Sequence, residues 1–429
     1  MSDPATERIK RLLAGLTNYE RTRPHAVAWS LEPIRALLAR PGARSFPGPA
    51  VQIGGSKGKG STAVYLESLA RSAGLRVGTY LSPHVSSVLE RIRLDGENVS
   101  EAGLVATLEP ILAWMQQSGR TATFFEVMTA AAAQIFACRA CDLAIYEVGL
   151  GGRLDATTAL PVAASILTTI ELEHTQLLGD TVAAIAAEKV PIVRAGGVAF
   201  TAVGGEALAV ARAPAARGGA DLRESGRDFG IRDLHSRGAG FTGRLWTGKG
   251  VEAAFALQDA PAVELTALAL AFACHAELFP ALRPRLDPVV RPQLPGRCEI
   301  RHDPDGSVWI LDGAHTAESL AHLAAELGRR FPGRRLALLF AAAIDKRWQA
   351  GLSALLPLVD RACVTRLADT ASAEPDEIVT WLRARGVPAE TAPDASVGLA
   401  WLARQGSLRL VTGSFYLVGA ARVRTEAKP

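Results

Sequence analysis

A glycine- and lysine-rich stretch, residues 54–62 (GGSKGKGST), most constrains what this chain can fold into. An apolar run at residues 50–53 precedes it and reads as a buried strand, and a helical pattern follows, with Val64, Leu66 and Leu69 on one face. A strand, a glycine-rich turn and a helix together present backbone N–H groups and a positive helix end to phosphate. Because both flanks fit, the sequence predicts a nucleotide-binding loop; a flexible basic turn is the alternative.

Each residue type in this loop has a physical task. Glycines let the backbone approach a ligand closely, because no Cβ intervenes. Lys59 is expected to reach the outer phosphates of ATP, and Ser61 to offer a hydroxyl to Mg²⁺. The spacing departs from G-x-x-x-x-G-K-[ST], because Ile53 stands at the first glycine position and Gly60 separates the lysine from Ser61. The expected ATP-binding residues are Gly55, Ser56, Lys57, Gly58, Lys59, Gly60, Ser61 and Thr62.

Length and charge limit the functional classes. The 429 residues suffice for two or three domains. A net charge of +4 gives no support to nucleic-acid binding. The longest apolar run, residues 265–274, is about half of the roughly 20 residues that a bilayer demands, and the first residues lack the apolar core of a signal peptide. We expect a cytoplasmic monomer that binds small molecules, without nucleic-acid or membrane partners.

The five cysteines form a sparse, odd set, which is typical of reduced thiols. Cys138 and Cys141 make one C-x-x-C at the end of an alanine-rich helical pattern. No second C-x-x-C or nearby histidine completes a zinc set. Packing is therefore the favoured interpretation of this pair, and a redox role is the alternative.

Polar residues follow several predicted strands near the phosphate loop. The strand at 76–80 leads to Ser82-Pro83-His84, the strand at 142–148 contains Glu147, and the strand at 163–168 precedes His174. Strand ends beside a phosphate loop are where α/β proteins place functional groups. Ser82, Glu147 and His174 are therefore candidate Mg²⁺ ligands, and His84 is a candidate substrate contact. An ordinary turn at 82–84 and a structural role for His174 are the alternatives.

Helical patterns connect these strands. They cover residues 101–117, 123–137 and 263–279, and Asp180 or Thr181 is expected to cap a helix that contains Lys189. The adjacent aromatics Phe124 and Phe125 fit a core position better than a ligand platform. Residues 204–260 have little periodicity, and we expect strands and loops there.

The pattern restarts after a proline-rich linker at Pro288, Pro292 and Pro295. Strands are expected at 308–311, 336–340, 361–365 and 408–411, with helices between them, which predicts a second parallel sheet. Polar residues again collect at strand ends, among them Asp312 with His315, Asp345 with Lys346, and Ser414. The predicted domains are residues 1–294 and 295–429, both of the α/β class.

Taken together, these motifs resemble the folylpolyglutamate synthase/dihydrofolate synthase family of the Mur ligase superfamily. The resemblance rests on residues 58–62, 82–84, 90–93, 123–126, 147–157, 174–175, 178–181, 188–189, 295–297, 311–315, 412–414 and 416–419. It implies a P-loop-type Mur ligase central domain and a smaller Rossmann-like C-terminal domain, with the active site between them. It also implies an ATP- and Mg²⁺-dependent ligase that adds L-glutamate to dihydropteroate, to reduced folates or to both, through an acyl phosphate.

The resemblance also assigns roles to single residues. Ser82, Glu147 and His174 would hold metal together with Ser61, and Lys189 matches the lysine that is carbamylated in this superfamily. Arg297 and Asp312 would contact ATP phosphates. The expected catalytic residues are Lys59, Lys189, Asp312 and His315, and the expected substrate-binding residues are Thr123, Phe125, Asp155, His84, Arg153 and Ser414.

Several positions depart from the family pattern. Ser56-Lys57 replaces Thr-Asn, Glu173 replaces Asp, Thr158 replaces Asn, Val190-Pro191 replaces Ala-Gly, and Thr316-Ala317 replaces Asn-Pro. The segment near Val263 lacks the His-Gln and Asn of the family's nucleotide-contacting helix. Two alternatives follow, a paralogous Mur-type amide ligase with a different acid and amine, and a degenerate nucleotide-binding relative without catalysis.

Overall fold

A computed structural model describes residues 4–19, 29–172, 175–289, 291–344, 346–367 and 371–426. The chain divides into two compact units, Met1–His84 with Leu89–Pro292, and Val85–Val88 with Gln293–Pro429. Each unit is built on its own largely parallel sheet, so the predicted α/β class is confirmed. The short segment Val85–Val88 belongs to the second unit, although the sequence analysis assigned it to the N-terminal domain.

The first unit contains an eight-stranded sheet with β1 near its centre. Strands β2, β5, β1, β6, β7 and β8 are parallel, and β3 and β4 extend one edge in antiparallel fashion. All five residues of β1 are buried, as the apolar run predicted. The phosphate loop therefore leaves the middle of the sheet. The strands are β1 (Ala50–Gly54), β2 (Val77–Tyr80), β3 (Ile92–Leu94), β4 (Glu97–Asn98), β5 (Leu143–Glu147), β6 (Ala164–Leu167), β7 (Val198–Thr201) and β8 (Asp221–Glu224).

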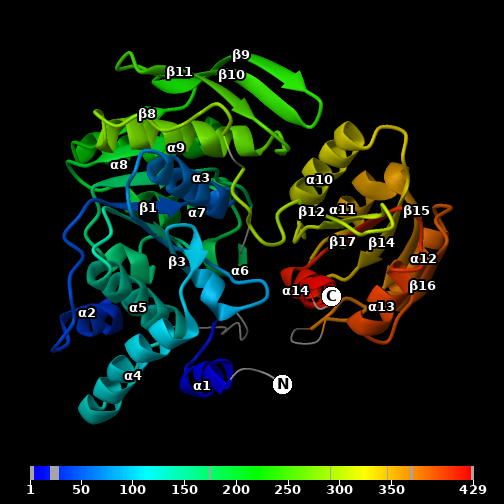
Figure 1. Cartoon of the computed structure of the whole chain (residues 1–429), viewed down its shortest axis with the longest axis horizontal. Coiled ribbons are helices and arrows are strands. Elements are labelled where there is room, and N and C mark those ends of the chain that lie inside the picture. The colour runs from blue at the N-terminus through cyan, green and yellow to red at the C-terminus, as the bar shows by residue number, and fades with distance from the viewer. Residues whose placement is uncertain are drawn as a thin grey trace. The chain divides into compact units, whose positions relative to one another are not determined.

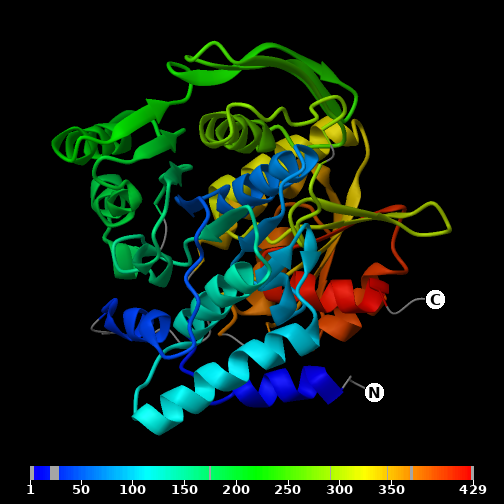
Figure 2. The ribbon, with the colours of Figure 1, turned by 60° about the vertical axis from the view of Figure 1, so that its left-hand side comes forward.

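Helices cover both faces of this sheet. Helices α3 (Lys59–Ser72) and α9 (Glu264–Leu278) pack against each other on one face (Figures 1 and 2). On the other face, Gly78 and Tyr80 of β2 meet Phe136 and Phe125 of α5 (Phe124–Cys138). Outside α5 lie α1 (Pro4–Leu13), α2 (Glu32–Ala39) and α4 (Glu101–Ser118). The remaining helical segments of this unit are α6 (Thr175–Leu178), α7 (Val182–Lys189), α8 (Gly205–Arg217) and the 3₁₀ turns η2 (Ala156–Ala159) and η3 (Val190–Ile192). The 3₁₀ turn η1 (Val88–Arg91) also belongs to this unit, except for its first residue.

Residues 204–260 differ in part from the expectation. Helix α8 occupies 205–217, where strands and loops were expected, so that prediction was wrong. The helix was hard to predict because its alanines do not form a clear apolar stripe and because Pro214 lies within it. Ala207 and Ala211 are nevertheless buried in a core shared with α7. The edge strand β8 follows, and the remainder forms a small antiparallel sheet on α9, with strands β9 (Phe229–Arg237), β10 (Gly240–Thr247) and β11 (Glu252–Leu257).

The second unit confirms the predicted second parallel sheet. Its strand order is β12-β13-β17-β14-β15-β16, and only β12 runs antiparallel to its neighbour. One core contains residues of α10, α11 and α12, and a second core contains residues of α13 and α14. The elements are β12 (Glu299–His302), β13 (Val308–Leu311), α10 (Ala317–Arg330), β14 (Leu336–Phe340), α11 (Trp348–Leu355), η4 (Leu356–Leu358), β15 (Val359–Val364), α12 (Pro375–Arg383), β16 (Ala389–Thr391), α13 (Ala395–Leu402), β17 (Leu408–Thr412) and α14 (Phe415–Glu426).

Within the described parts of the chain, no helix combines the length and the apolar character that crossing a bilayer requires.

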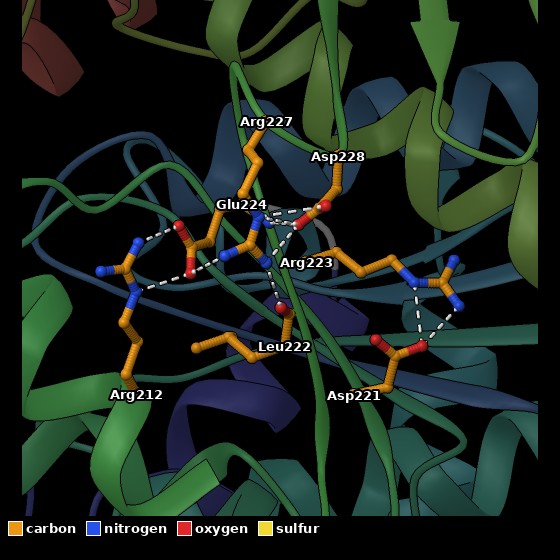
Figure 3. A network of polar contacts seen from close by, with 7 residues as sticks. All are labelled: Arg212, Asp221, Leu222, Arg223, Glu224, Arg227 and Asp228. Carbon is orange, nitrogen blue, oxygen red and sulfur yellow. Dashed lines mark hydrogen bonds and ion pairs between the residues drawn. The ribbon is translucent and has the colours of Figure 1, made fainter. Parts of the chain in front are cut away.

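An ion-pair network fastens α8 to the edge strand β8 (Figure 3). Arg212 of α8 donates two hydrogen bonds to Glu224, at 2.8 and 2.6 Å, and Arg227 donates to the same carboxylate at 3.0 Å. The bond from Arg212 holds the pKa of Glu224 below its usual range. The Glu224 side chain is 8% exposed, whereas the side chains of Arg212 and Arg227 are 54% and 56% exposed, so solvent screens these contacts in part.

We predict that Glu224→Gln lowers the free energy of unfolding by about 1–2 kcal/mol, because a bidentate, charge-assisted contact is lost. A carboxylate with a depressed pKa stabilises the fold above its ordinary pKa, and that contribution disappears as pH falls below this value. The difference between wild type and variant should therefore be present at pH 7 and vanish in acid. Urea unfolding at both pH values measures it. Exposed Glu206, in the first turn of α8, provides the matched control Glu206→Gln; an equal effect of the two variants contradicts the assignment.

His275 is a buried, polar exception in the core of the first unit. Its side chain is 0% exposed, and neither ring nitrogen has a hydrogen-bond partner among the described residues. Its ring centroid lies 5.6 Å from that of Phe279. Burial, helped by the charge of Arg283, lowers the pKa of His275 to about 4. The folded state therefore holds this imidazole neutral.

Unfolding exposes an imidazole with an ordinary pKa, so protonation favours the unfolded chain as pH falls from about 6.5 to 4. We predict a loss of about 3 kcal/mol of stability over this window from His275 alone. Urea unfolding of His275→Leu should show a correspondingly shallower dependence on pH. His235→Leu, on exposed β9, is the control and should keep the slope of the wild type. Identical slopes for wild type and His275→Leu would contradict the prediction.

Candidate active site

The loop between β1 and α3 adopts a conformation that requires glycine. Gly55 has φ +135°, and a Cβ there would lie 2.1 Å from Oγ1 of Thr168. Gly58 caps the N-terminus of α3 with φ +82°. The first hydrogen bond inside α3 runs from Thr62 N to Gly58 O at 2.8 Å. The N–H groups of residues 59–61 therefore have no acceptor within the helix and can serve an anion.

The end of strand β6 holds this loop in place. Ser56 N donates to Thr169 O at 2.7 Å, and Lys57 N donates to Thr169 Oγ1 at 3.0 Å. Thr168 Oγ1 donates to Lys57 O at 2.6 Å. The amides of Ser56 and Lys57 thus brace the loop, and residues 58–61 supply the remaining N–H groups. The sequence analysis missed Thr168 and Thr169; their only signal is their place directly after a buried strand.

Two lysine side chains converge on one carbonyl oxygen of the loop. Lys59 Nζ lies 2.9 Å from Gly55 O and 3.2 Å from Ser56 O, and Lys189 Nζ lies 3.1 Å from Gly55 O. Lys189 is 2% exposed. Thr62 follows three residues after Lys59. Its Oγ1 is buried and has no hydrogen-bond partner among the described residues. Two positive charges at one glycine loop make a place where polyanionic ligands are stabilised.

Two of the predicted metal ligands meet at the ends of β2 and β5. Ser82 N donates to Glu147 Oε2 at 2.8 Å, and Glu147 is 3% exposed. Ser61 lies half-buried in the first turn of α3. Carboxylate and hydroxyl oxygens are the donors that Mg²⁺ prefers, so this set fits the ion. His174 lies outside the described residues, and within them no cluster of three or more His, Cys, Asp or Glu side chains could hold a metal.

Asp155 organises the loop that follows β5. Its carboxylate accepts hydrogen bonds from Gly149 N at 2.9 Å, Leu150 N at 3.2 Å and Thr157 N at 2.9 Å. Burial raises the pKa of Asp155, and these hydrogen bonds oppose the rise. Arg153 pairs with Glu188 at 3.0 Å. Both side chains were predicted to bind substrate, and their observed contacts are with the protein itself.

A polar network beneath the phosphate loop was also missed. Gln52 of β1 donates from Nε2 to Thr157 Oγ1 at 2.9 Å and to Thr158 Oγ1 at 2.8 Å. Arg194 donates to Gln52 Oε1 at 3.2 Å and to Thr158 O at 2.7 Å. A glutamine within an otherwise apolar strand was the only sequence signal. The network links the strand before the loop to the segment that Asp155 organises.

The other predicted substrate residues of this unit lie around β2 and α5. Thr123 caps α5 in a reciprocal capping box with Glu126. The ring of Phe125 lies 5.6 Å from that of Tyr80, and a Cβ on Gly149 would come within 2.7 Å of it. His84 Nδ1 accepts a hydrogen bond from Arg91 at 2.8 Å.

In the second unit, Asp312 joins two turns. Its carboxylate accepts from Cys298 N at 2.6 Å and from Ala314 N at 2.8 Å. His315 Nδ1 lies 2.8 Å from Gly313 O. Ser414 is 8% exposed and accepts from Tyr416 N at 3.2 Å. Gly413 N donates to Ala314 O at 2.9 Å, so the turn that carries Arg297, the turn after β13 and the residues before α14 lie together within this unit.

The two cysteines of the C-x-x-C differ in their surroundings. Cys141 is 9% exposed, and burial raises its pKa to about 11. Cys138 is exposed, and neither cysteine is in a disulfide. Because redox chemistry needs an accessible thiolate, these observations favour the packing interpretation for Cys141 alone.

Comparison with known proteins places this geometry in a family context. A family model described as "Mur ligase, glutamate ligase domain" matches residues 296–415. A "probable bifunctional folylpolyglutamate synthase/dihydropteroate synthase" of Haloferax volcanii is 34% identical over 412 residues, which is 91% of this chain and 48% of that protein. The chain thus spans about half the length of this relative.

A second relative matches over most of both lengths. The "dihydrofolate synthase/folylpolyglutamate synthase" of Bacillus subtilis is 32% identical over 340 residues, covering 74% of this chain and 76% of that protein. Among solved structures, the folylpolyglutamate synthase of Mycobacterium tuberculosis complexed with ADP superposes with a TM-score of 0.84 at 26% identity. That match covers 99% of each chain.

The loop geometry predicts a graded response to alanine. Gly55→Ala forces a Cβ to 2.1 Å from Thr168 at a positive φ, whereas Gly58→Ala meets the positive φ but nothing within 4 Å. We expect a loss of about 1 kcal/mol for Gly58→Ala and at least about 2 kcal/mol more for Gly55→Ala. Urea unfolding measures both values. Gly204→Ala, with neither positive φ nor a close neighbour, is the control; equal losses at Gly55 and Gly58 would contradict the close approach of β6.

Proposed function

Because the chain belongs to the dihydrofolate synthase/folylpolyglutamate synthase family, we propose that it is an ATP-dependent ligase that joins L-glutamate to dihydropteroate, to reduced folates or to both. The observation that carries the proposal is the convergence of Lys59 and Lys189 on the carbonyl of Gly55. This arrangement suits a triphosphate, because the Lys59 ammonium group and the N–H groups at the start of α3 stabilise its negative charge in one place, while Lys189 holds the loop through Gly55 O. The ADP-bound mycobacterial relative is consistent with it.

In the first step, a carboxylate oxygen of the acceptor attacks the γ-phosphorus of ATP. The bond from this phosphorus to the β–γ bridging oxygen breaks, ADP leaves, and an acyl phosphate forms. Lys59 and the N–H groups of residues 59–61 stabilise the charge that moves onto the phosphate oxygens. The bracing by Thr168 and Thr169 keeps these donors preorganised, so little reorganisation accompanies the reaction.

In the second step, the amino nitrogen of glutamate attacks the acyl carbon. The C–N bond forms, the C–O bond to phosphate breaks, and the nitrogen loses a proton. We assign Arg297 to anionic oxygens, His315 to polar contact with the reactants, and Ser414 to the glutamate. Asp312 supports this group through the backbone bonds that it accepts.

The chemistry of the donor set suits a magnesium ion held by Ser61, Ser82 and Glu147, with His174 as a further ligand. When bound, the ion neutralises phosphate charge. We also propose that Lys189 is carbamylated. Its neutral amine adds to carbon dioxide, a C–N bond forms, and a proton is released. The remaining N–H can still donate to Gly55 O, and the repulsion between two ammonium groups on one oxygen is removed.

Substrate contacts by Thr123, Phe125, Asp155, His84 and Arg153 stay predictions, as do the cytoplasmic location, the monomeric state and the absence of a nucleic-acid partner. The contacts of Asp155 and Thr123 support an indirect role, because their oxygens hold backbone groups in place.

We predict that purified protein releases ADP when ATP, Mg²⁺, L-glutamate and either dihydropteroate or tetrahydrofolate are all present, and that omission of glutamate or acceptor abolishes release above background. Lys59→Ala should lower kcat by at least about 100-fold, because a charge opposite the transferring phosphoryl group is lost. A coupled ADP assay measures both.

Lys10→Ala removes an exposed lysine of α1, which pairs with Glu7 at 2.8 Å, and should leave kcat unchanged. Higher turnover with another acid or amine would show that folate and glutamate are not the substrates. Tight ATP binding without ADP release under any condition would contradict the ligase activity and indicate a protein that only binds nucleotide.

A further inference from the structure

Phe415, the first residue of α14, lies among the residues that the proposed function needs in the second unit. The Arg297 guanidinium carbon lies 4.3 Å from the centroid of the Phe415 ring. The His315 ring centroid lies 6.1 Å from it, with the two rings inclined at 68°. One half-buried aromatic ring therefore contacts both side chains, a cation on its face and an imidazole in an edge-to-face arrangement.

Two glycines lie close to this ring. A Cβ on Gly313 would lie 2.3 Å from the nearest ring atom of Phe415, and a Cβ on Gly296 would lie 3.4 Å away. Gly313 N donates to Gly296 O at 2.9 Å, which joins the two glycine turns. The ring thus occupies a slot between two turns that are bonded to each other.

The same turns aim the functional side chains. Cys298, next to Arg297, has φ +45°, and its N–H is held by Asp312 at 2.6 Å. His315 Nδ1 lies 2.8 Å from Gly313 O, and because a carbonyl can only accept, Nδ1 carries the proton. Backbone contacts therefore fix where each side chain begins, and the Phe415 ring contacts the ends of both.

We propose that Phe415 is a positioning residue that holds Arg297 and His315 in their working orientation without touching substrate. The inference rests on the proposed function for its kinetic consequence, although the contact itself can be tested separately. A leucine fills a similar apolar volume but offers no π face to the guanidinium and no ring edge to the imidazole. Arg297 and His315 then sample other rotamers, and reactive geometries become rarer.

Steady-state kinetics of Phe415→Leu and Phe415→Tyr test the proposal. We expect Phe415→Leu to lower kcat/KM by about 10- to 100-fold, the penalty for misplaced catalytic groups. In Phe415→Leu, the decrease in kcat/KM should come from a lower kcat, measured at saturating ATP and glutamate, because the substrates still bind. Phe415→Tyr keeps the ring and should stay within about threefold of wild type. Unfolding temperatures of both variants report whether the fold is intact.

The second unit offers a matched control. Phe331 lies under Arg334, whose guanidinium carbon is 5.8 Å from the ring centroid, and neither residue belongs to the proposed site. Phe331→Leu removes an aromatic ring beneath an arginine and should leave kcat/KM unchanged. Equal kinetics for Phe415→Leu and Phe415→Tyr, whether both normal or both impaired, would overturn the proposal.

NMR separates this inference from the proposed function. In the wild type, the ring current of Phe415 should shift the Arg297 side-chain resonances upfield, with assignment by loss of the signal in Arg297→Lys. Phe415→Leu should abolish that shift and Phe331→Leu should not. If wild-type protein released no ADP, the proposed function would be wrong, but the upfield shift of the Arg297 resonances would still show whether Phe415 contacts Arg297. Absence of this shift in the wild type would overturn the inference.

Discussion

The carbonyl oxygen of Gly55 is the point on which the arrangement of the first unit depends. It accepts from Lys59 at the start of α3 and from Lys189 at the end of α7, and the residue itself packs against Thr168 after β6. Three segments that are far apart in the sequence therefore meet at one peptide group. A carbonyl that accepts from two side-chain N–H donors is strongly polarised, and the charge of Lys59 together with the N–H groups of α3 favours an anion beside it. The loop is thus both a structural junction and an electrostatic one.

Many polar side chains around this junction act on the backbone. Asp155 collects three N–H groups, Thr169 occupies the amides of the phosphate loop, and Gln52 bridges to Thr157. Each bond is buried or partly buried, where losing one partner would leave a costly unsatisfied group. Such shells fix the geometry of ligand-binding groups before any ligand arrives. The second unit follows the same rule, since Asp312 joins two turns through their N–H groups.

Sequence reasoning worked where a single local signal was strong. The apolar run of β1, the glycine loop, the cap of α7 by Thr181 and the parallel strands of both units follow from periodicity and turn chemistry, and all are present. It failed where tertiary contacts decide the outcome. Helix α8 contains Pro214 and is stabilised by the burial of its alanines. Strand β12 is a polar edge strand that pairs with β13. The bracing roles of Thr168, Gln52 and Asp155 depend on partners that are distant in the sequence or belong to a loop, so motif spacing could not reveal them.

Three of the departures from the family pattern have local structural explanations. Thr158, in place of asparagine, accepts from Gln52 and donates to Gly152 O at 2.6 Å. Pro191 lies in the first turn of η3, where a missing N–H costs little, and Val193 N still donates to Val190 O at 2.8 Å. Thr316 caps α10 in a reciprocal capping box with Ser319. The hydrogen bonding at these three positions is intact, so the fold accommodates the three departures without leaving a polar group unsatisfied there.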